Sequence, residues 1–234
     1  MNTRSEIRRH IFQHKIIAVI RLRAAPYLEE NMVPIVEAII AGGIQIIEIT
    51  LDTPGALEWI HHFSESFKKN TVAGGEECIV GAGTVLDMAG AGRALAAGAQ
   101  FLVSPVLFEE MVPFAHESDA CAMPSGFTPT ELWRAWNAGA DVVKIFPASG
   151  AGPDSIKAIR GPLPQIPLCP SSGVTPENAE AYLRAGAAAL GAGTSLVNQQ
   201  FMQERADAEK FAEITRRASL FTTLANAAGQ TFFP

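Results

Sequence analysis

Short, almost wholly apolar runs alternate with longer helix-like stretches along the chain, and this alternation constrains the fold more than any other feature. Apolar runs of this kind are typical of strands that are buried on both faces of a parallel sheet and separated by helices. Eight of them occur, at residues 16–20, 44–51, 78–80, 101–103, 120–123, 141–146, 167–169 and 187–190. In one chain of 234 residues, they predict an α/β fold that closes into a single (β/α)8 TIM barrel.

A small repeat marks where the predicted helices turn back into strands. It is Ala-Gly plus one more small residue, at positions 41–43, 97–99, 138–140 and 185–187. Glycine is the usual residue just beyond a helix end. An open doubly wound sheet is the alternative, but no Gly-x-Gly-x-x-Gly fingerprint follows the first strand. We expect one domain over residues 1–234, with extra N- and C-terminal helical segments, the latter at Arg205–Ala228, and a loose end from Gly229 to Pro234.

Composition and charge narrow the class of protein. Hydrophobic residues make up 48% of the chain and charged residues 18%, which supplies a sizeable core. The net charge of -6 gives no sign of a nucleic-acid partner. The sequence has neither an apolar run of about 20 residues to span a membrane nor the apolar segment of a signal peptide. Three widely spaced cysteines argue against a disulfide framework, so we expect a cytoplasmic protein.

Three charged residues interrupt apolar strands near the strand ends, where barrel enzymes carry their active sites: Glu48, Lys144 and Arg21. Burial of Lys144 would lower the pKa of its amine and free it to attack a ketone; alternatively, its ammonium reaches the rim on a buried stem. Glu48 is either a general acid/base or half of a structural ion pair with Lys144 or Arg21. Since they lie on the second and sixth strands, Glu48 and Lys144 can both point into a barrel, which predicts a catalytic pair.

Two late loops have the composition of a phosphate site. Residues 171–178 read Ser-Ser-Gly-Val-Thr-Pro-Glu-Asn, which predicts a loop, a threonine cap and a helix that begins with proline. Residues 191–195 read Gly-Ala-Gly-Thr-Ser and follow the eighth strand. Loops in these two places commonly bind phosphate in barrel enzymes, although small residues also serve tight turns. The Gly-Ala-Gly-Thr sequence at 81–84 has the same two interpretations, a turn or a contact between Thr84 and a substrate carboxylate.

Histidines could indicate a metal-dependent mechanism if they lay near the strand ends. They do not, because they occur at positions 10, 14, 61, 62 and 116. A metal-dependent mechanism would need histidine and carboxylate ligands at the strand ends. We therefore expect neither a metal site nor a cofactor.

Taken together, these segments resemble the 2-keto-3-deoxy-6-phosphogluconate / 4-hydroxy-2-oxoglutarate aldolase family, including its 6-phosphogalactonate branch. The resemblance runs from about His14 to Val197 and rests on residues 46–51, 80–86, 143–148 and 173–178. It implies a homotrimeric class I aldolase, metal-independent, that cleaves a 2-keto-3-deoxy-6-phospho sugar acid to pyruvate and glyceraldehyde 3-phosphate. It also implies Lys144 as the Schiff-base lysine and Glu48 as the acid/base.

The same resemblance implies a wider substrate site. Thr84 would hold the pyruvate carboxylate, and Gly173 and Thr194 would bind the phosphate. The full set of expected substrate-binding residues is Arg21, Thr84, Pro105, Phe146, Ser172, Gly173, Gly193 and Thr194.

Three positions depart from the family pattern. Asp52 stands where many members carry an arginine, Ser172 where many have glycine, and Ser125 where a Pro-Gly turn is usual. Because Asp52 would repel a carboxylate, we expect Arg21 to make the anion contact in its place. Two other functions remain open from the sequence: a phosphosugar isomerase or synthase, which would not need Lys144, and a non-catalytic sugar-phosphate sensor.

Overall fold

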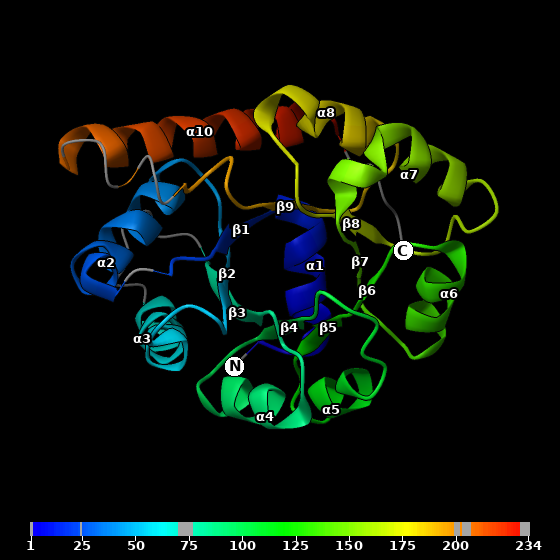
Figure 1. Ribbon diagram of the computed structural model, residues 1–234, viewed down its shortest axis with the longest axis horizontal. Helices are drawn as coiled ribbons and strands as arrows, with labels where there is room; N and C mark the ends of the chain where they lie inside the picture. The colour runs from blue at the N-terminus through cyan, green and yellow to red at the C-terminus, as the bar shows by residue number, and fades with distance from the viewer. Residues whose placement is uncertain (1, 24, 70–76, 199–201, 203–206, 230–234) are drawn as a thin grey trace.

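The protein is represented by a computed structural model that describes residues 2–23, 25–69, 77–198, 202 and 207–229. Parallel strands curl around a common centre and helices cover their outer side (Figure 1). The strands are β1 (Ile16–Ile20), β2 (Ile46–Thr50), β3 (Ile79–Gly83), β4 (Phe101–Val103), β5 (Cys121–Met123), β6 (Ser125–Gly126), β7 (Val143–Ile145), β8 (Leu168–Pro170) and β9 (Leu190–Ala192). The helices are α1 (Arg4–His14), α2 (Ala25–Ala41), α3 (Ala56–Lys68), α4 (Met88–Ala96), α5 (Met111–Glu117), α6 (Pro129–Asn137), the 3-10 helix η1 (Ala148–Gly150), α7 (Gly152–Arg160), α8 (Pro176–Arg184) and α10 (Asp207–Ala227).

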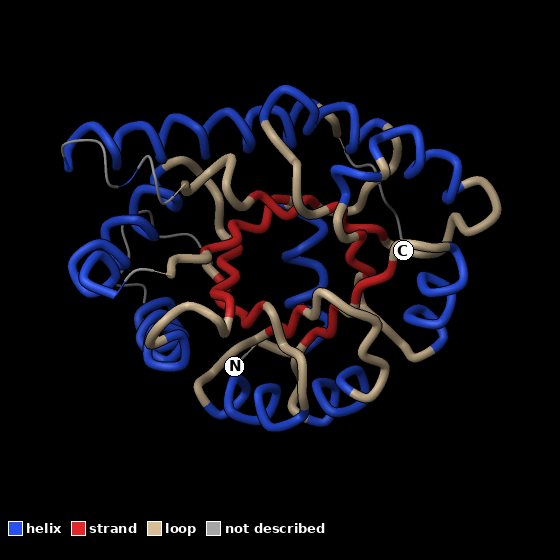
Figure 2. Tube along the Cα trace, in the orientation of Figure 1, coloured by secondary structure: helices blue, strands red, loops and turns tan. Residues whose placement is uncertain are grey.

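The strands are hydrogen-bonded as two parallel sheets. Six follow the order β5-β4-β3-β2-β1-β9, and three follow the order β6-β7-β8. Figure 2 shows both sheets curling around one centre. Each of the eight predicted strands is present. The curled parallel α/β fold is confirmed, whereas the closed eight-stranded barrel is not, because the strands form two sheets. Pro124, which has no N–H to donate to a ladder, separates β5 from β6.

Three glycines from the two Gly-Ala-Gly motifs lie inside strands, so the interpretation of these positions as turns is wrong. Gly81 and Gly83 belong to β3, and Gly191 belongs to β9. A Cβ at Gly81 would overlap the ring of Phe101, and a Cβ at Gly83 would overlap the side chain of Glu48. Glycine within a strand marks such close approaches between neighbours.

Alternate residues of the strands divide the apolar core into two parts. Ile47 and Ile145 face outward and join the large cluster beneath the helices. Ile46, Met123 and Cys169 face inward and join a smaller cluster inside the curled sheet. This separation follows from the period of two along a strand.

Helix α1 closes one end of the interior. Its residues Ile7 and Ile11 belong to the inner cluster, and the helix lies across the middle of the ring of strands in Figure 2. Arg4 Nε lies 2.8 Å from Oδ1 of Asp141, whose side chain is buried just before β7. The helix therefore covers the amino-terminal ends of the strands, and the interior is left to open at their carboxyl ends.

The predicted helix ends and terminal segments are confirmed where the structure describes them. Gly43, Gly98, Gly139 and Gly186 have φ angles between 91° and 99°, as the repeat predicts. Helix α10 packs along α2 and α8. Residues 205–206 of the predicted terminal helix, and 230–234 of the predicted loose end, lie outside the described residues. Among the described helices, none is long and apolar enough to cross a membrane.

Candidate active site

Lys144 and Glu48 meet inside the curled sheet. Lys144 lies at the middle of β7 and Glu48 at the middle of β2, and both side chains are almost fully buried. The distance from Lys144 Nζ to Glu48 Oε1 is 4.0 Å, which is too long for a direct hydrogen bond. Glu48 Oε1 has no hydrogen-bond partner among the described residues. A buried amine therefore faces a buried carboxylate oxygen that is available to a water molecule or a ligand.

Burial and charge act in opposite directions on Glu48. Burial raises the pKa of its carboxyl group above the ordinary value, and the positive charges of Lys144 and Arg21 oppose that shift without cancelling it. A carboxyl group with a raised pKa exchanges protons closer to neutral pH. The candidate site thus places an amine and a carboxyl group close enough to contact one small molecule.

Arg21 and Thr84 form the rim of the site above Glu48. Arg21 Nη2 donates to Thr84 Oγ1 at 2.8 Å, and its Nε lies 3.3 Å from Asp52 Oδ1. Thr84 has a φ of 57°, a conformation that costs energy for a β-branched residue and that clusters at functional sites. The rim therefore presents a guanidinium group that is fixed from two sides.

Asp52 pairs with two arginines and does not stand alone at the rim. Its Oδ2 also lies 3.3 Å from Arg23 Nη2. Partial burial acts to raise the pKa of Asp52, but hydrogen bonds and the charge of Arg21 hold it below its ordinary value. The carboxylate that departs from the family pattern is therefore paired with two guanidinium groups at the rim.

The two predicted phosphate loops lie next to each other. Ser195 Oγ, after β9, donates to Val174 O, after β8, at 2.6 Å. Asn178, in the first turn of α8, donates from Nδ2 to Gly173 O at 2.8 Å. Ser172 and Gly173 have φ angles of 73° and 78°, and both are exposed. Gly193 and Thr194 follow β9, so that all four predicted residues lie on this paired loop surface.

The remaining predicted residues lie at the same end of the sheet. The ring centroid of Phe146 is 5.3 Å from Lys144 Nζ, within cation–π range. Pro105 is half-buried in the loop that follows β4. Cys169, in register with Lys144, lines the interior, and burial raises the pKa of its thiol to about 12. The thiol therefore stays protonated beside the amine.

Two residues near Lys144 and Glu48 are not among the predicted site residues, although one of them, Ser125, is a departure from the family pattern. Gly83 lies under Glu48, where any larger residue would displace the carboxylate. Ser125 is paired in register with Lys144 and is 1% exposed. The sequence offers only a weak signal for either, because glycine and serine are also common in the turns that follow strands.

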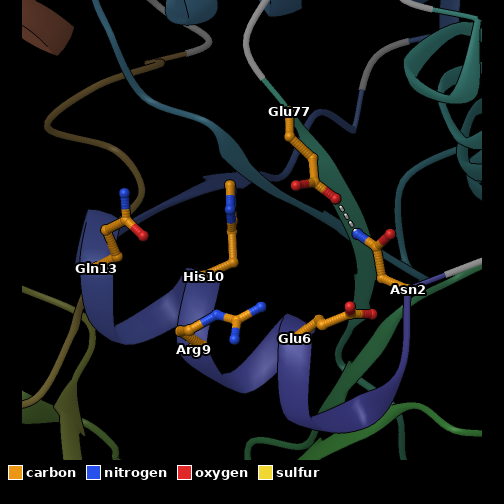
Figure 3. A pocket seen from close by; sticks show the side chains of 6 residues that line it. All are labelled: Asn2, Glu6, Arg9, His10, Gln13 and Glu77. Carbon is orange, nitrogen blue, oxygen red and sulfur yellow. Dashed lines mark hydrogen bonds between the residues drawn. The ribbon is translucent and has the colours of Figure 1, made fainter.

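A separate hollow of about 240 Å³ lies at the opposite end, against α1. Figure 3 shows that Asn2, Glu6, Arg9, His10, Gln13 and Glu77 line it. Burial and the neighbouring His14 lower the pKa of His10 to about 4, against the opposing charge of Glu77. Because α1 separates this hollow from the carboxyl ends of the strands, it is not part of the candidate site. Among the described residues, no group of three or more His, Cys, Asp or Glu could hold a metal ion.

Comparison with known proteins agrees with this geometry. A family model described as KDPG and KHG aldolase matches residues 7–216. The chain is 33% identical over 190 residues to the KHG/KDPG aldolase of Escherichia coli K12, covering 81% of this chain and 85% of the relative. It is 35% identical over 162 residues to the 2-dehydro-3-deoxy-6-phosphogalactonate aldolase of the same organism, covering 69% and 76%.

A solved structure of an aldolase also has a similar fold. The KDPG aldolase from Legionella pneumophila, with pyruvate captured at low pH as a covalent carbinolamine intermediate, aligns with a TM-score of 0.76 and 29% identity. The alignment covers 89% of this chain and 95% of that one. The paired lysine and glutamate, the paired loops and these matches lead to one conclusion: the chain belongs to the KDPG and KHG aldolase family.

Proposed function

We propose that this protein is a class I aldolase that cleaves a 2-keto-3-deoxy-6-phospho sugar acid, of the gluconate or galactonate type, to pyruvate and glyceraldehyde 3-phosphate. The observation that carries the proposal is the buried pair of Lys144 and Glu48, 4.0 Å apart. Schiff-base catalysis requires an amine to attack the ketone and an acid/base group beside it to move protons. The family relationship supports the same chemistry.

In the proposed mechanism, the neutral amine of Lys144 attacks the ketone carbon, and the carbinolamine loses water to give an iminium. The hydroxyl on C4 then loses its proton, the bond between C3 and C4 breaks, and its electron pair moves into the iminium. The aldehyde leaves, and an enamine of pyruvate remains on the lysine. Protonation at C3 and hydrolysis release pyruvate and restore the amine. Glu48 moves the protons, through a bridging water where the gap requires one.

Two anion contacts orient the proposed substrate. Arg21 and Thr84 bind the carboxylate of the pyruvyl half, because they form the cationic rim above Glu48. The paired loops that carry Ser172, Gly173, Gly193 and Thr194 bind the phosphate. Exposed N–H groups in such loops and at the start of α8 suit a phosphate group. Phe146 and Pro105 provide apolar contacts to the carbon chain between the two anions.

The first test is reduction with borohydride in the presence of excess pyruvate, followed by intact-protein mass and peptide mapping. We expect one reduced pyruvate adduct, located on Lys144. Lys144→Ala should form no adduct and should lose turnover while remaining folded. Lys68→Ala, on the outer helix α3, should behave like the wild type. Substantial turnover by Lys144→Ala would overturn the lysine assignment.

The substrate class is tested by comparing 2-keto-3-deoxy acids of gluconate and galactonate configuration, with and without the 6-phosphate. We expect kcat/KM to fall when the phosphate is absent. If neither a pyruvate adduct nor cleavage is observed, a phosphosugar isomerase and a sugar-phosphate sensor replace the aldolase. Isomerisation of a phosphosugar would select the first, and thermal stabilisation by sugar phosphates without turnover would select the second.

We also propose that the two sheets form one closed (β/α)8 barrel within a single domain. A bridge between Ser171 and Gly191 joins the end of β8 to β9, and Ala188 N–H donates to Leu168 O at 2.8 Å. On the other side, Lys144 N–H donates to Pro124 O at 3.0 Å, across the break between β5 and β6. Slow amide hydrogen exchange at Ala188 and Lys144 is the expected result, whereas fast exchange at both would indicate two open sheets.

We further propose that the protein assembles as a homotrimer. Three large apolar side chains are exposed on loops that follow β3, β4 and β6: Leu86 at 58%, Val106 at 49% and Phe127 at 44%. Exposed apolar residues at neighbouring loops are typical of subunit interfaces. Light scattering coupled to gel filtration should give three times the chain mass of 24.9 kDa. Leu86→Asp combined with Val106→Asp should reduce the mass to that of a monomer.

A further inference from the structure

Ser125 has a buried hydroxyl group whose hydrogen-bonding capacity is not used. Its Oγ has no hydrogen-bond partner within the described part of the chain, and the residue is 1% exposed. Burial of an unpaired hydroxyl destabilises a folded protein, and native structures contain few such groups. A hydroxyl kept in this state indicates a position at which a bound molecule supplies the missing partner.

The side chain of Ser125 points into the interior of the curled sheet. Met123, two residues earlier, belongs to the inner cluster. Gly126, the next residue, faces α6, because a Cβ at that position would contact Glu131. Since successive strand residues point to opposite faces, Ser125 faces inward.

Ser125 occupies the same layer as the reacting amine. The register of β6 with β7 pairs Ser125 directly with Lys144. Val143 and Ile145, on either side of Lys144, belong to the outer cluster, so the lysine side chain faces inward as well. Across this interior, Oε1 of Glu48 is a second buried oxygen without a hydrogen-bond partner among the described residues. Both unpaired oxygens therefore belong to side chains that face the same interior as the Lys144 side chain, where the proposed substrate binds.

The strand order indicates which part of the substrate Ser125 meets. In the three-stranded sheet β6-β7-β8, Lys144 is on the middle strand and Ser125 is on one side of it. The loop with Ser172 and Gly173 follows β8, on the other side. A substrate whose phosphate lies on this loop presents its opposite half, the pyruvyl half, to Ser125.

We propose that Ser125 Oγ forms a hydrogen bond with an oxygen of the pyruvyl half and thereby fixes the bound ketone beside Lys144. The proposal rests on the proposed aldolase function. Ser125 is thus a substrate-binding residue of this chain in addition to the rim formed by Arg21 and Thr84. The neighbouring inward-facing residues Met123 and Cys169 are apolar or only weakly polar. The Ser125 hydroxyl therefore adds a hydrogen-bonding group to a largely apolar part of the interior.

The test is Ser125→Ala, measured for both activity and stability. We expect kcat/KM for cleavage to fall roughly 10-fold, and the pyruvate concentration for half-maximal borohydride trapping to rise by a similar factor. The melting temperature should stay unchanged or rise by about 2 °C, because the variant removes an unpaired buried hydroxyl without opening a cavity. Ser125→Gly should show the same loss in trapping if alanine perturbs the packing.

Thr215→Val provides the matched control. Thr215 Oγ1 donates to Ala38 O at 3.0 Å, outside the sheet, where α10 packs on α2. This variant should lose stability and keep its activity, which is the opposite pattern. A lower melting temperature for Ser125→Ala would assign Ser125 a structural role and overturn the proposal.

The outcome also separates this inference from the function on which it rests. If wild type forms the adduct on Lys144 and Ser125→Ala matches it in trapping and kcat/KM, the role of Ser125 is wrong and the aldolase assignment stands. If wild type forms no adduct, the aldolase assignment fails, and the role of Ser125 fails with it.

Discussion

Lys144 Nζ and Glu48 Oε1 lie 4.0 Å apart, although their strands, β7 and β2, stand on opposite sides of the ring in Figure 1. Only the curl of the parallel strands brings them together. The gap is longer than a hydrogen bond and accommodates the oxygen of a carbinolamine or a water between nitrogen and carboxylate. The pair is therefore not a tight ion pair, and its spacing suits the proton transfer across a bound molecule that we propose.

Glu48→Gln is expected to abolish the acidic limb of the pH profile of kcat/KM. In the wild type, activity should fall as pH falls through the pKa of Glu48, and burial moves this fall above the ordinary carboxyl range. The variant should have low activity without this limb. Turnover assays from acidic to neutral pH provide the measurement.

The same substitution has a consequence for stability. A raised pKa means that the folded state favours the protonated carboxyl, so this contribution to stability is present below the ordinary value of 4.5 and is lost as pH rises toward the folded-state pKa. Glu48→Gln should therefore gain stability relative to wild type as pH rises through that interval. Urea unfolding at a series of pH values tests this, with the exposed Glu65→Gln as control, for which no such gain is expected.

Gly83→Ala is expected to lower kcat/KM by roughly 100-fold, because the added methyl group overlaps the Glu48 side chain and moves its carboxylate. Gly92→Ala, in helix α4, is the matched control. A Cβ at Gly92 meets only the ring of Phe114, at 3.7 Å, so this variant should keep its activity. It should also gain about 0.5–1 kcal/mol of stability from the removal of a helical glycine. Steady-state kinetics that show equal activity for the two variants would refute the packing argument for Gly83.

Arg21→Met is expected to raise the pyruvate concentration needed for borohydride trapping by roughly 10- to 100-fold, since a charged donor to the carboxylate is lost. Arg23→Met is the comparison, because both arginines pair with Asp52 but only Arg21 donates to Thr84. The side chain of Arg23 is 71% exposed, and its loss should change trapping by about twofold or less. Equal effects would show that the charge of the rim, and not the position of Arg21, attracts the anion.

Ser172→Gly is expected to increase stability. Ser172 has a φ of 73°, and a non-glycine residue in this region costs about 1 kcal/mol. Thermal unfolding should show a rise of about 2–4 °C. Gly139→Ala is the reciprocal variant, since Gly139 has a φ of 95° and the nearest atoms to an added Cβ are 3.7 Å away. It should lose a similar amount of stability through backbone strain alone, and an unchanged melting temperature for both variants would contradict the strain.

The strands and the approach of Lys144 to Glu48 could be predicted because they follow from burial. Near-continuous apolar runs such as Ile16–Ile20 have few alternatives to a strand that is covered on both faces. Lys144 and Glu48 are charged residues within such runs, and burying a charge costs much desolvation energy. Each could therefore be identified as a candidate functional residue from the sequence alone.

Gly83, Gly191 and Ser125 could not be predicted in their observed places, because their environment depends on register. In one sequence, Gly-Ala-Gly fits a turn as well as a strand under a bulky neighbour. The contact between Gly83 and Glu48 arises from the pairing of β2 with β3. Likewise, the position of Ser125 beside Lys144 follows from the pairing of β6 with β7, which begins after the break at Pro124.

Helix α1, whose Ile7 and Ile11 fill the amino-terminal end of the interior, closes that end of the proposed reaction site. The proposed substrate and its products then pass by the other end, at the carboxyl ends of the strands. After cleavage, the pyruvyl fragment remains covalently held at depth, and the aldehyde fragment lies nearer to the opening. Since the covalent bond to Lys144 lets the aldehyde depart before pyruvate, the first helix of the chain places the fragment that leaves first nearest to the exit.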